Sequence, residues 1–451
     1  MGGRTTRPAV WTNWARNQTA QPAEVAHPTD AEEVAALVKA AAETGGRVRP
    51  IGSGHSFTAI GRPDESATQL VLDRCADLIA LDSSSGMVTV QAGMTLRRLN
   101  RLLAEAGLAL TNLGDIEEQT IAGAISTGTH GTGAAYGGLA TQVRALELVL
   151  GDGSIVTCSK AERPELFAAA RVGLGAIGVI TSVTLQTVPM FVLRAEEGPM
   201  GLDEVLDRLD AFTAEVDHFE FYWFPHTANT LVKRNTRLPF TGPESLDPQS
   251  RIGAWITDEL LSNTAFGGVV ALGRRIPAAI PSIARLNSRA LGSRTFTDLS
   301  YRVFTSPRRV RFVEMEYAVP RAALGAVVRE LVAAVNASDL RISFPVEVRV
   351  AAADDIPLST ASGRESGYIA VHMDYRSDSS RYFELVEKIM VAAGGRPHWG
   401  KMHTRDADYL RGQYPRFDEF LAARDAAAPA GVFRNDYLDR VLGRPGGAAS
   451  A

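Results

Sequence analysis

Helix and strand patterns of apolar residues alternate through the first third of the chain. Apolar positions 34, 37, 38 and 41 have the spacing of an amphipathic helix, which Thr29 and Glu32 open as a capping box and Gly45 follows. A second helix is predicted between an N-cap at Thr95 and Gly107. Strands are predicted at 47–51, 87–91, 143–150, 155–158 and 179–188, the third and fourth joined as a hairpin by a glycine-rich turn. We expect residues 1–188 to form one domain.

A different pattern begins after Pro189. Helices are predicted at 202–216 and 380–393, strands at 218–224, 311–319, 341–350 and 367–375, and a proline-containing loop at 236–251. Pro320 is expected at the first position of a further helix. This order predicts an antiparallel sheet with helices on one face, and so an α+β fold with a second domain at 189–393. Residues 394–451 have too little core to stand alone, and we expect them to pack back on the first domain.

Composition narrows the class of protein. Lys and Arg number 47 against 51 Asp and Glu, so the net charge of −4 leaves no basic surplus for a general nucleic-acid binder. No apolar run reaches the ~18 residues of a membrane span, and the first residues lack the apolar stretch of a secretory signal. Cys75 and Cys158 form neither a disulfide framework nor a CxxC pair. We expect a cytoplasmic protein, with peripheral membrane association left open.

A G-x-G-x-x-G sequence at 173–178 has the wrong context for a dinucleotide fingerprint. That fingerprint follows a strand and opens a helix, so that the helix amino terminus meets the pyrophosphate. Here a helix pattern at 164–171 precedes the glycines and a strand at 179–185 follows them. We therefore do not predict a Rossmann NAD site. Glycine is still dense in this region, with 12 of the 41 glycines between 114 and 178, which indicates either backbone close to a ligand or a tightly coiled sheet.

Two loops rich in small residues are candidate ligand contacts. The first, at 50–56, follows a strand and offers backbone N–H groups and hydroxyls in a form suited to phosphate. Its histidine, His55, is either a functional group or simply exposed. The second, at 112–133, places hydroxyl and amide side chains between small residues. It either lines a planar ligand or is a turn-rich crossover.

A later strand offers candidate chemistry for a substrate. Valines alternate along 344–350 and occupy one face, so Glu347 and Arg349 share the other. Such a pair is either a structural salt bridge or part of a site. Four potential ligands at 398, 403, 406 and 408 lack the spacing of a metal motif such as HExxH, so no metal is predicted.

Together these motifs resemble a known family. The RxxGSGHS loop at 49–56, NLGDIEEQTIAGAISTGTHGTG at 112–133 and GLGAIGVIT at 173–181 resemble the PCMH-type FAD-binding domain of the vanillyl-alcohol-oxidase superfamily. RPHWGK at 396–401 and FRNDYL at 433–438 resemble its sugar-1,4-lactone branch, the L-gulono- and D-arabinono-1,4-lactone oxidases and dehydrogenases, above all the actinobacterial L-gulono-1,4-lactone dehydrogenases. The resemblance runs from residue 11 to residue 442. Alditol oxidases share the same motifs.

The resemblance implies an FAD site. In the family the first loop holds the FAD pyrophosphate, and its histidine, matched here by His55, is bonded covalently to the flavin 8α-methyl carbon. Gly114 matches a position beside the flavin carbon that oxygen attacks, where glycine leaves room for oxidase activity. Gly178 or Val179 matches a contact near the adenine. The implied cofactor-binding residues are Pro50, Ile51, Gly52, Ser53, Gly54, His55, Ser56, Gly114, Asp115, Thr120, Gly123, Thr127, Gly128, Thr129, His130, Gly178, Val179 and His398.

The resemblance also implies a substrate and a reaction. Glu347 and Arg349 match residues that face the flavin and hold sugar hydroxyls, and Lys401 matches a lysine that meets the same substrate. The implied activity is that of an FAD-dependent aldonolactone oxidoreductase. It oxidises the C2 hydroxyl of a sugar 1,4-lactone, passes a hydride to flavin N5 and gives a 2-keto lactone that enolises to an ascorbate-type product. Oxygen or another acceptor then takes the electrons. The alternatives are an alditol oxidase acting on xylitol or sorbitol, and a non-catalytic sugar-binding protein.

Overall fold

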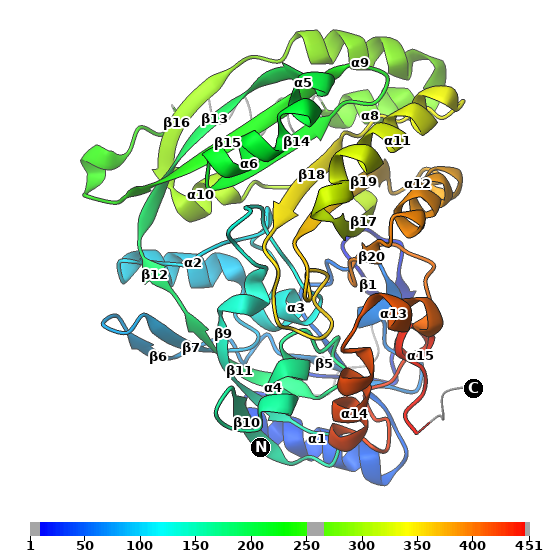
Figure 1. Ribbon diagram of the computed structural model, residues 1–451. Helices are drawn as coiled ribbons and strands as arrows, with labels where there is room; N and C mark the ends of the chain where they lie inside the picture. Colours follow the sequence, from blue (N-terminus) through cyan, green and yellow to red (C-terminus); the bar gives the residue numbers. More distant parts are fainter. Residues whose placement is uncertain (1–9, 250–265, 447–451) are drawn as a thin grey trace.

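The chain folds into two stacked parts (Figure 1). The computed structural model describes residues 10–249 and 266–446. In Figure 1 the lower part holds the amino-terminal strands together with the carboxy-terminal helices, and the upper part holds a large sheet with its covering helices. This arrangement confirms the predicted α+β class. Within the described ranges, no helix combines the length and the apolar character that crossing a bilayer requires.

Two sheets form the lower part. The parallel sheet has the order β3-β5-β4 (Glu24–Ala26, Thr68–Val71, Val48–Ile51). The antiparallel sheet has the order β10-β9-β11-β7-β6 (Ile155–Ser159, Val143–Val149, Val179–Gln186, Met87–Gln91, Leu78–Asp82). Shorter pairs join β1 to β2 (Trp11–Thr12, Thr19–Ala20) and β8 to β12 (Leu108–Ala109, Val188–Pro189). The helices that the amino-terminal segment adds to this part are α1 (Ala31–Glu43), α2 (Leu96–Glu105), α3 (Ile121–Ser126) and α4 (Pro164–Ala170).

Local sequence signals explain where these elements begin and end. Thr95 caps α2 as predicted, and the antiparallel pairing of β9 with β10 confirms the predicted hairpin. The prediction of Thr29 as the cap of α1 is wrong by one residue. The Asp30 carboxylate accepts from the Glu33 N–H at 2.8 Å, and the Glu33 carboxylate accepts from the Thr29 N–H at 2.9 Å. A reciprocal acid pair therefore takes the place of the Thr29–Glu32 box.

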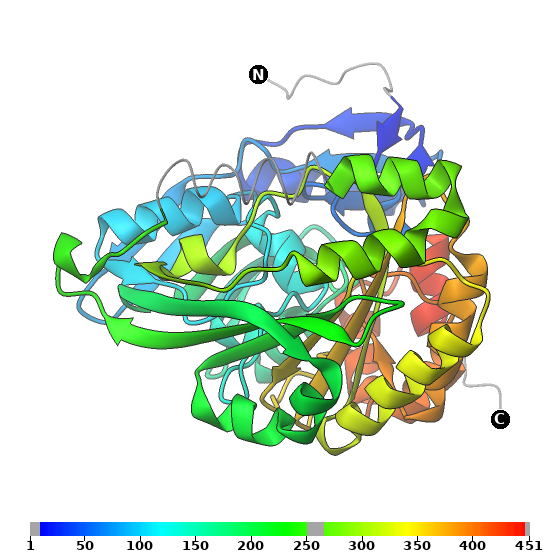
Figure 2. The same cartoon turned by 90° about the horizontal axis from the view of Figure 1, so that it is seen from above.

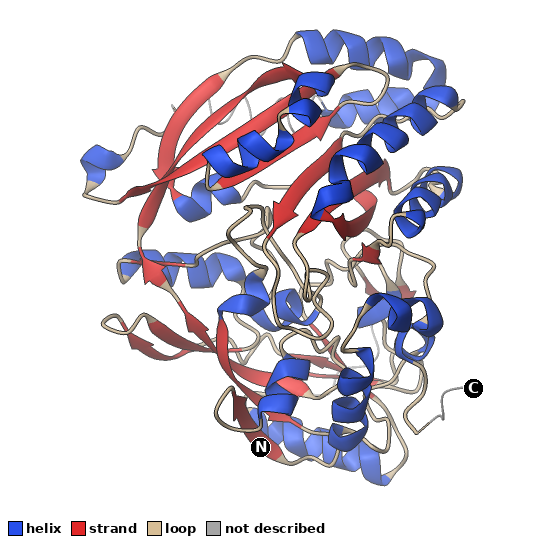
Figure 3. Ribbon diagram, in the orientation of Figure 1, coloured by secondary structure: helices blue, strands red, loops and turns tan. Residues whose placement is uncertain are grey.

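One antiparallel sheet organises the upper part. Its order is β16-β13-β15-β14-β18-β19-β17-β20 (Arg294–Leu299, Phe191–Gly201, Asn229–Pro239, His218–Trp223, Val346–Ala351, Ser366–Asp374, Phe312–Pro320, Arg396–Pro397). The alternate valines of β18 lie in a buried apolar cluster with α5, α6, α11 and α12 (Leu202–Asp207, Leu209–Glu215, Leu324–Ala337, Ser380–Ala392), as the two-residue period predicted. Figure 3 shows these helices on one side of the strands. The opposite face carries Glu316, Glu347 and Arg349, and it faces the lower part, because Glu316 contacts His130 and Arg349 lies 3.9 Å from Asp115.

Four predicted boundaries in the upper part need correction. The helix predicted at 202–216 is broken at Arg208 into α5 and α6. The loop predicted at 236–251 begins inside β15, because pairing with β13 extends to Pro239; its last two residues lie outside the described ranges. Pro320 ends β17, and α11 starts only at Leu324, after a short 3-10 turn. Residues 341–345 precede the strand, which starts at Val346, so β18 is shorter than predicted.

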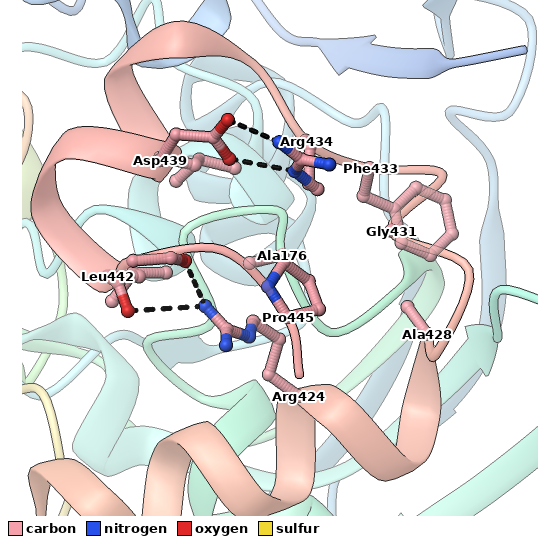
Figure 4. A pocket seen from close by; sticks show the side chains of 11 residues that line it. Ala176, Arg424, Ala428, Gly431, Phe433, Arg434, Asp439, Leu442 and Pro445 are labelled. Atoms are coloured by element: carbon pink, nitrogen blue, oxygen red, sulfur yellow. Dashed lines mark hydrogen bonds and ion pairs between the residues drawn. The ribbon is translucent and has the colours of Figure 1, made fainter. Parts of the chain in front are cut away.

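The carboxy-terminal helices share the core of the lower part. They are α13 (Ala407–Gln413), α14 (Phe417–Ala427) and α15 (Asp436–Leu442), and their apolar residues belong to the same buried cluster as those of α1, β9 and β11. Figure 4 shows how the segment is held: Arg424 donates to the Gly443 carbonyl at 2.7 Å, and Arg434 forms an ion pair with Asp439. The pocket drawn there holds about 10 Å³, room for a single water, so it is a packing seam and not a ligand site.

Candidate active site

A cavity of about 410 Å³ opens in the lower part where three loops converge. The loops are 49–56, 119–127 and 174–180, and the second and most of the third lie in the glycine-dense stretch between 114 and 178. A volume of this size falls in the ~300–1,000 Å³ range of cofactor pockets. Twelve of the predicted cofactor-binding residues line it: Pro50, Ile51, Gly52, Ser53, Gly54, His55, Ser56, Thr120, Gly123, Thr127, Gly178 and Val179.

Backbone geometry explains why small residues are needed at this cavity. Gly54 adopts a φ of +70°, a left-handed conformation that favours glycine. A Cβ at Gly52 would overlap the hydroxyl of Thr120, which caps α3 by accepting from the Gly123 N–H at 3.2 Å. The first two loops can touch only because residue 52 has no side chain.

The polar groups around the cavity suit an anionic ligand. Asp73 is the one carboxylate among the described residues that line it, whereas Arg49 and Arg98 are both present. Seven hydroxyl side chains also line the cavity, and hydroxyls together with backbone N–H groups suit a pyrophosphate; they are Ser53, Ser56, Thr58, Thr95, Thr120, Ser126 and Thr127. These residues therefore fit FAD.

Arg49 connects three segments of the cavity wall. Its guanidinium is buried and donates to the carbonyls of Leu174 at 2.9 Å and Phe433 at 2.9 Å, which lie in the third loop and in the carboxy-terminal segment. Burial lowers its pKa to about 10, against a smaller opposing effect of Asp64, so the side chain is still charged at neutral pH. One buried cation thus fixes three distant segments around one cavity.

His55 is held as a neutral side chain at the cavity. Its ring stacks on Trp14 with centroids 5.6 Å apart. Burial, and secondarily the charge of Lys401, lower the pKa of His55 to about 4. At neutral pH its imidazole therefore keeps an unprotonated nitrogen.

The charged face of the upper sheet brings Glu347 and Arg349 together as predicted. Arg349 Nη2 lies 2.5 Å from Glu347 Oε1, and its Nε donates to Glu220 at 2.7 Å. The Tyr222 hydroxyl donates to Glu347 Oε1 at 2.6 Å. The register explains these contacts, because Tyr222 pairs directly with Glu347 across β14 and β18, and opposite residues of an antiparallel pair share a face.

Asp115 connects this face to the loop at 112–133. Its carboxylate lies 2.5 Å from Arg308 and 3.9 Å from Arg349. The loop after α10 (Ser300–Phe304) is held at the same point, since the Ser306 N–H donates to the Asp115 carbonyl at 3.0 Å. Burial alone would raise the pKa of Asp115, but the charges of Arg308, Arg349 and Lys401 outweigh it and lower the pKa.

Lys401 lies on the same face of the sheet as Glu347, next to strand β17. It forms an ion pair with Glu314 of β17, and its ammonium lies 5.3 Å from the ring of Phe57. Burial would lower the pKa of Lys401, but Glu314 and Glu316 outweigh it, so the pKa is raised and the side chain is charged. The neighbouring Gly400 carbonyl accepts from the Phe57 N–H at 2.6 Å, next to the cavity loop, so Lys401 connects that loop to Glu314 on the charged face.

The remaining predicted residues lie beside the cavity and do not line it. They are Gly114, Asp115, Gly128, Thr129, His130 and His398. A Cβ at Gly114 would come within 3.1 Å of the Thr129 side chain and 3.2 Å of the His130 carbonyl, so its hydrogen faces the chain itself. His130 contacts Glu316 at 2.7 Å and stacks on Tyr368 at 3.7 Å.

Three potential metal ligands come together among the described residues. Atoms of His130, Glu316 and His398 all lie within 4.8 Å of one another, and all three side chains are buried. His130 and Glu316 already satisfy each other, and His398 Nδ1 accepts from the Gly400 N–H at 3.1 Å. This set differs from the sequence neighbours considered earlier, of which His403 contacts the Tyr437 hydroxyl and Asp406 caps α13.

Comparison with known proteins identifies the family. Residues 183–441 match the model described as D-arabinono-1,4-lactone oxidase, and residues 22–159 match the FAD binding domain. An L-gulono-1,4-lactone dehydrogenase of Mycobacterium tuberculosis is 41% identical over 96% of this chain and 99% of its own length. The chain belongs to the D-arabinono-1,4-lactone oxidase family. The sequence motifs had indicated this sugar-lactone branch and FAD as the cofactor, and both expectations are confirmed.

The chain also matches oxidases from other organisms and a solved structure of the same fold. An L-gulonolactone oxidase of Bos taurus is 36% identical over 95% of this chain and 97% of its own. An alditol oxidase of a Streptomyces species is 31% identical over 96% and 98%. A solvent-stable cholesterol oxidase of known structure superposes with a TM-score of 0.81 at 20% identity over 96% and 97% of the two chains, which shows a shared fold.

Sequence reasoning missed several residues of the charged face. They are Glu220, Tyr222, Lys233, Arg308, Glu314, Glu316 and His372. Glu314-Met315-Glu316 has the same two-residue period as Glu347-Val348-Arg349, and that signal was available in the sequence. Arg308 lies in a loop with no periodic pattern, so only the fold reveals its place.

Proposed function

We propose that this chain oxidises the C2 hydroxyl of a sugar 1,4-lactone of the L-gulono-1,4-lactone type, giving a 2-keto lactone that enolises to an ascorbate-type product. The observation that carries the proposal is the juxtaposition of two features: a cavity suited to FAD, with His55 in its wall, and a buried charged face with Glu347, Arg349 and Lys401. The printed names of the relatives, L-gulono-1,4-lactone dehydrogenase and L-gulonolactone oxidase, support this substrate class.

FAD, when bound, supplies the acceptor for the hydride that leaves the substrate carbon. The chain's residues must then manage the proton and the negative charge of the hydroxyl oxygen. Glu347 is suited to accept the proton, because burial raises its pKa even though the charge of Arg349 opposes the rise. Arg349 and Lys401 are suited to stabilise the developing alkoxide, since fixed charges act strongly where water is excluded. The Tyr222 hydroxyl orients the Glu347 carboxylate.

The proposal includes a covalent link between His55 and the flavin. A neutral imidazole nitrogen is the nucleophile that such a bond needs, and burial keeps His55 neutral. The purified protein is expected to be yellow and to keep its flavin with the polypeptide after acid precipitation, and a His55→Ala variant is expected to release it. Flavin that acid frees from the unmodified protein would contradict the covalent link and leave the rest of the proposal standing.

A substrate panel tests the reaction itself. L-gulono-1,4-lactone, D-arabinono-1,4-lactone, xylitol and sorbitol are compared, with dissolved-oxygen and artificial-acceptor readouts run in parallel. We expect lactones to be turned over faster than polyols, with oxygen or another acceptor taking the electrons. The alditol oxidase relative makes polyol oxidation the second candidate, and preferential turnover of xylitol would establish it instead. Absence of turnover with all four by a flavin-loaded protein would reject both.

A Glu347→Ala variant tests the assignment of the base. It is expected to keep FAD, because Glu347 lies outside the cavity lining, and to lose turnover. Arg349→Lys is the matched comparison, since it keeps the charge but loses the fork that contacts Glu347 and Glu220 together. Unchanged kinetics in Glu347→Ala would remove this residue from the mechanism. We further propose 1–188, 189–393 and 394–451 as the domain limits and the cytoplasm as the location.

A further inference from the structure

The first two strands of the chain enclose a turn that lies beside the FAD cavity. β1 pairs with β2, and residues 13–18 connect them. Figure 2 shows this end of the chain in dark blue at the rim of the molecule. Trp11 of β1 lines the cavity, but none of residues 13–18 does. The turn is therefore not part of the cavity wall, although it contacts the loop at 50–56 that is.

Two hydrogen bonds fix this loop to the turn on both sides of His55. The Trp14 N–H donates to the Gly54 carbonyl at 2.8 Å, and the Asn13 side-chain amide donates to the Ser56 carbonyl at 2.9 Å. Asn13 is buried, so losing its partner would leave a polar group without water to replace it. The backbone that carries the histidine is thus held in place immediately before and after it.

The ring of Trp14 is held as firmly as the loop. It meets Phe57 edge-on with centroids 6.4 Å apart, and Phe312 edge-on with centroids 5.3 Å apart. Its stack on His55 is close to parallel, with an angle of 28° between the planes. Edge-to-face and offset-stacked pairs are the arrangements that aromatic rings prefer. The two edge contacts keep Trp14 from turning, so it presents a fixed face to the imidazole.

Stacking, and not a hydrogen bond, orients the imidazole of His55. Among the described residues, neither of its ring nitrogens has a hydrogen-bond partner, and its ring contact is with Trp14. Histidines whose orientation matters are usually fixed by a hydrogen bond to one ring nitrogen. A donor placed on the unprotonated nitrogen would occupy the in-plane lone pair that imidazole uses as a nucleophile. Stacking covers only a face of the ring, so it restricts the ring plane and leaves that lone pair free.

We propose that Trp14 is a positioning residue for the covalent attachment of the flavin to His55. The inference rests on the covalent link included in the proposed function. Attachment breaks one C–H bond of the flavin 8α-methyl group and the N–H bond of the imidazole, releases both protons and forms one N–C bond. The two electrons left over stay on the flavin until dissolved oxygen takes them up with two protons as hydrogen peroxide. Trp14 exchanges no atom or electron in this reaction; it holds the imidazole in the orientation from which bond formation starts.

The rate of attachment in the full-length protein tests this inference. The chain is produced in flavin-starved cells, excess FAD is added under air, and the flavin that stays with the polypeptide after acid precipitation is followed over time. Trp14→Leu is expected to bind FAD as the parent does, because Trp14 does not line the cavity, but to attach it roughly 10-fold more slowly. A factor of ten corresponds to about 1.4 kcal/mol, which is within the contribution of a stacked aromatic pair.

Two further variants separate positioning from packing. Trp14→Phe keeps a ring against the imidazole with the least disturbance to the fold, and its rate is expected to lie between those of the parent and Trp14→Leu. Phe312→Leu is the matched control, because it removes a ring that packs on Trp14 but does not contact His55. It is expected to attach flavin at the rate of the parent, even if it melts at a lower temperature.

FAD affinity, from quenching of flavin fluorescence, and melting temperature are measured on the same set of proteins. Equal attachment rates in the parent, Trp14→Phe and Trp14→Leu would overturn the inference and leave the covalent link standing. So would a slowing that Phe312→Leu shares in full, or one that disappears when FAD is saturating. A parent that forms no acid-stable flavin would refute the covalent link itself, and the role of Trp14 with it.

Discussion

The hydroxyl of Tyr222 offers the most direct test of the charged face. Changing Tyr222 to Phe removes only the oxygen that donates to Glu347 Oε1 at 2.6 Å and lies 3.4 Å from Glu220. The ring keeps its packing because its shape is unchanged. The ion pair between Arg349 and Glu347 also stays, so the perturbation is confined to the hydrogen bonds of one hydroxyl, of which the bond to Glu347 is the shorter.

The size of the effect follows from that bond. A hydrogen bond to a charged group is worth about 1.5–3 kcal/mol, and one pKa unit corresponds to about 1.4 kcal/mol. Losing the bond disfavours the ionised carboxylate, so the pKa of Glu347 should rise by roughly 1–2 units beyond the rise that burial already causes. If ionised Glu347 accepts the substrate proton, the acid limb of kcat/KM should move to higher pH by the same roughly 1–2 units.

The assay is kcat/KM for the best lactone measured across pH. Tyr136→Phe is the matched control, because its hydroxyl donates to Asp217 at 3.0 Å and does not contact the charged face. We expect the control profile to coincide with that of the parent. A Tyr222→Phe profile with an unmoved acid limb would refute the reasoning, and a uniform loss at every pH would assign Tyr222 a purely structural role.

Three further predictions follow from the geometry. Gly52→Ala is expected to lower the FAD content and to cost about 1–3 kcal/mol of stability by overpacking. Gly412→Ala is the control, because a Cβ there meets open space, and it should leave the FAD content and the stability unchanged or improved. Flavin absorbance measures the first quantity and thermal melts the second. Lys401→Met is expected to keep FAD but to lower kcat/KM by roughly 10²-fold, measured with the same lactone; an unchanged value would remove Lys401 from the site. Burial lowers the pKa of both His218 and His398 from 6.5 to about 4. Between these pH values the unfolded chain binds more protons than the folded one. The free energy of unfolding should therefore fall by up to about 3 kcal/mol for each histidine as the pH drops from 6.5 to 4. Melting temperatures that stay flat between pH 6.5 and 4 would contradict this.

Periodicity in the sequence predicted the parts of the site that lie on regular strands. The alternation along β18 placed Glu347 and Arg349 on one face, and the structure has them in direct contact. The turn chemistry of 50–56 likewise predicted a phosphate-suited loop, which lines the cavity. Both signals depend only on residues a few positions apart, so the sequence alone was enough to predict them.

Contacts between distant segments could not be predicted in the same way. Arg308 and Asp115 are 193 positions apart, and nothing in either neighbourhood indicates that two loops from different parts of the fold meet. The position of Tyr222 beside Glu347 depends on the register between β14 and β18, which long-range packing decides. The break at Arg208 also depends on packing, because the apolar spacing continues through it.

Residues near both ends of the chain pack together in the core of the lower part, and this has a consequence for synthesis. Every loop that lines the cavity is made within the first 180 residues, but the Phe433 carbonyl that accepts from Arg49 emerges among the last. A nascent chain therefore has its cofactor loops long before the helices that lock them in place. Flavin capture should therefore be completed late in maturation, and a protein truncated before α13 should keep the binding loops and the Arg49–Leu174 contact but lose the Phe433 acceptor.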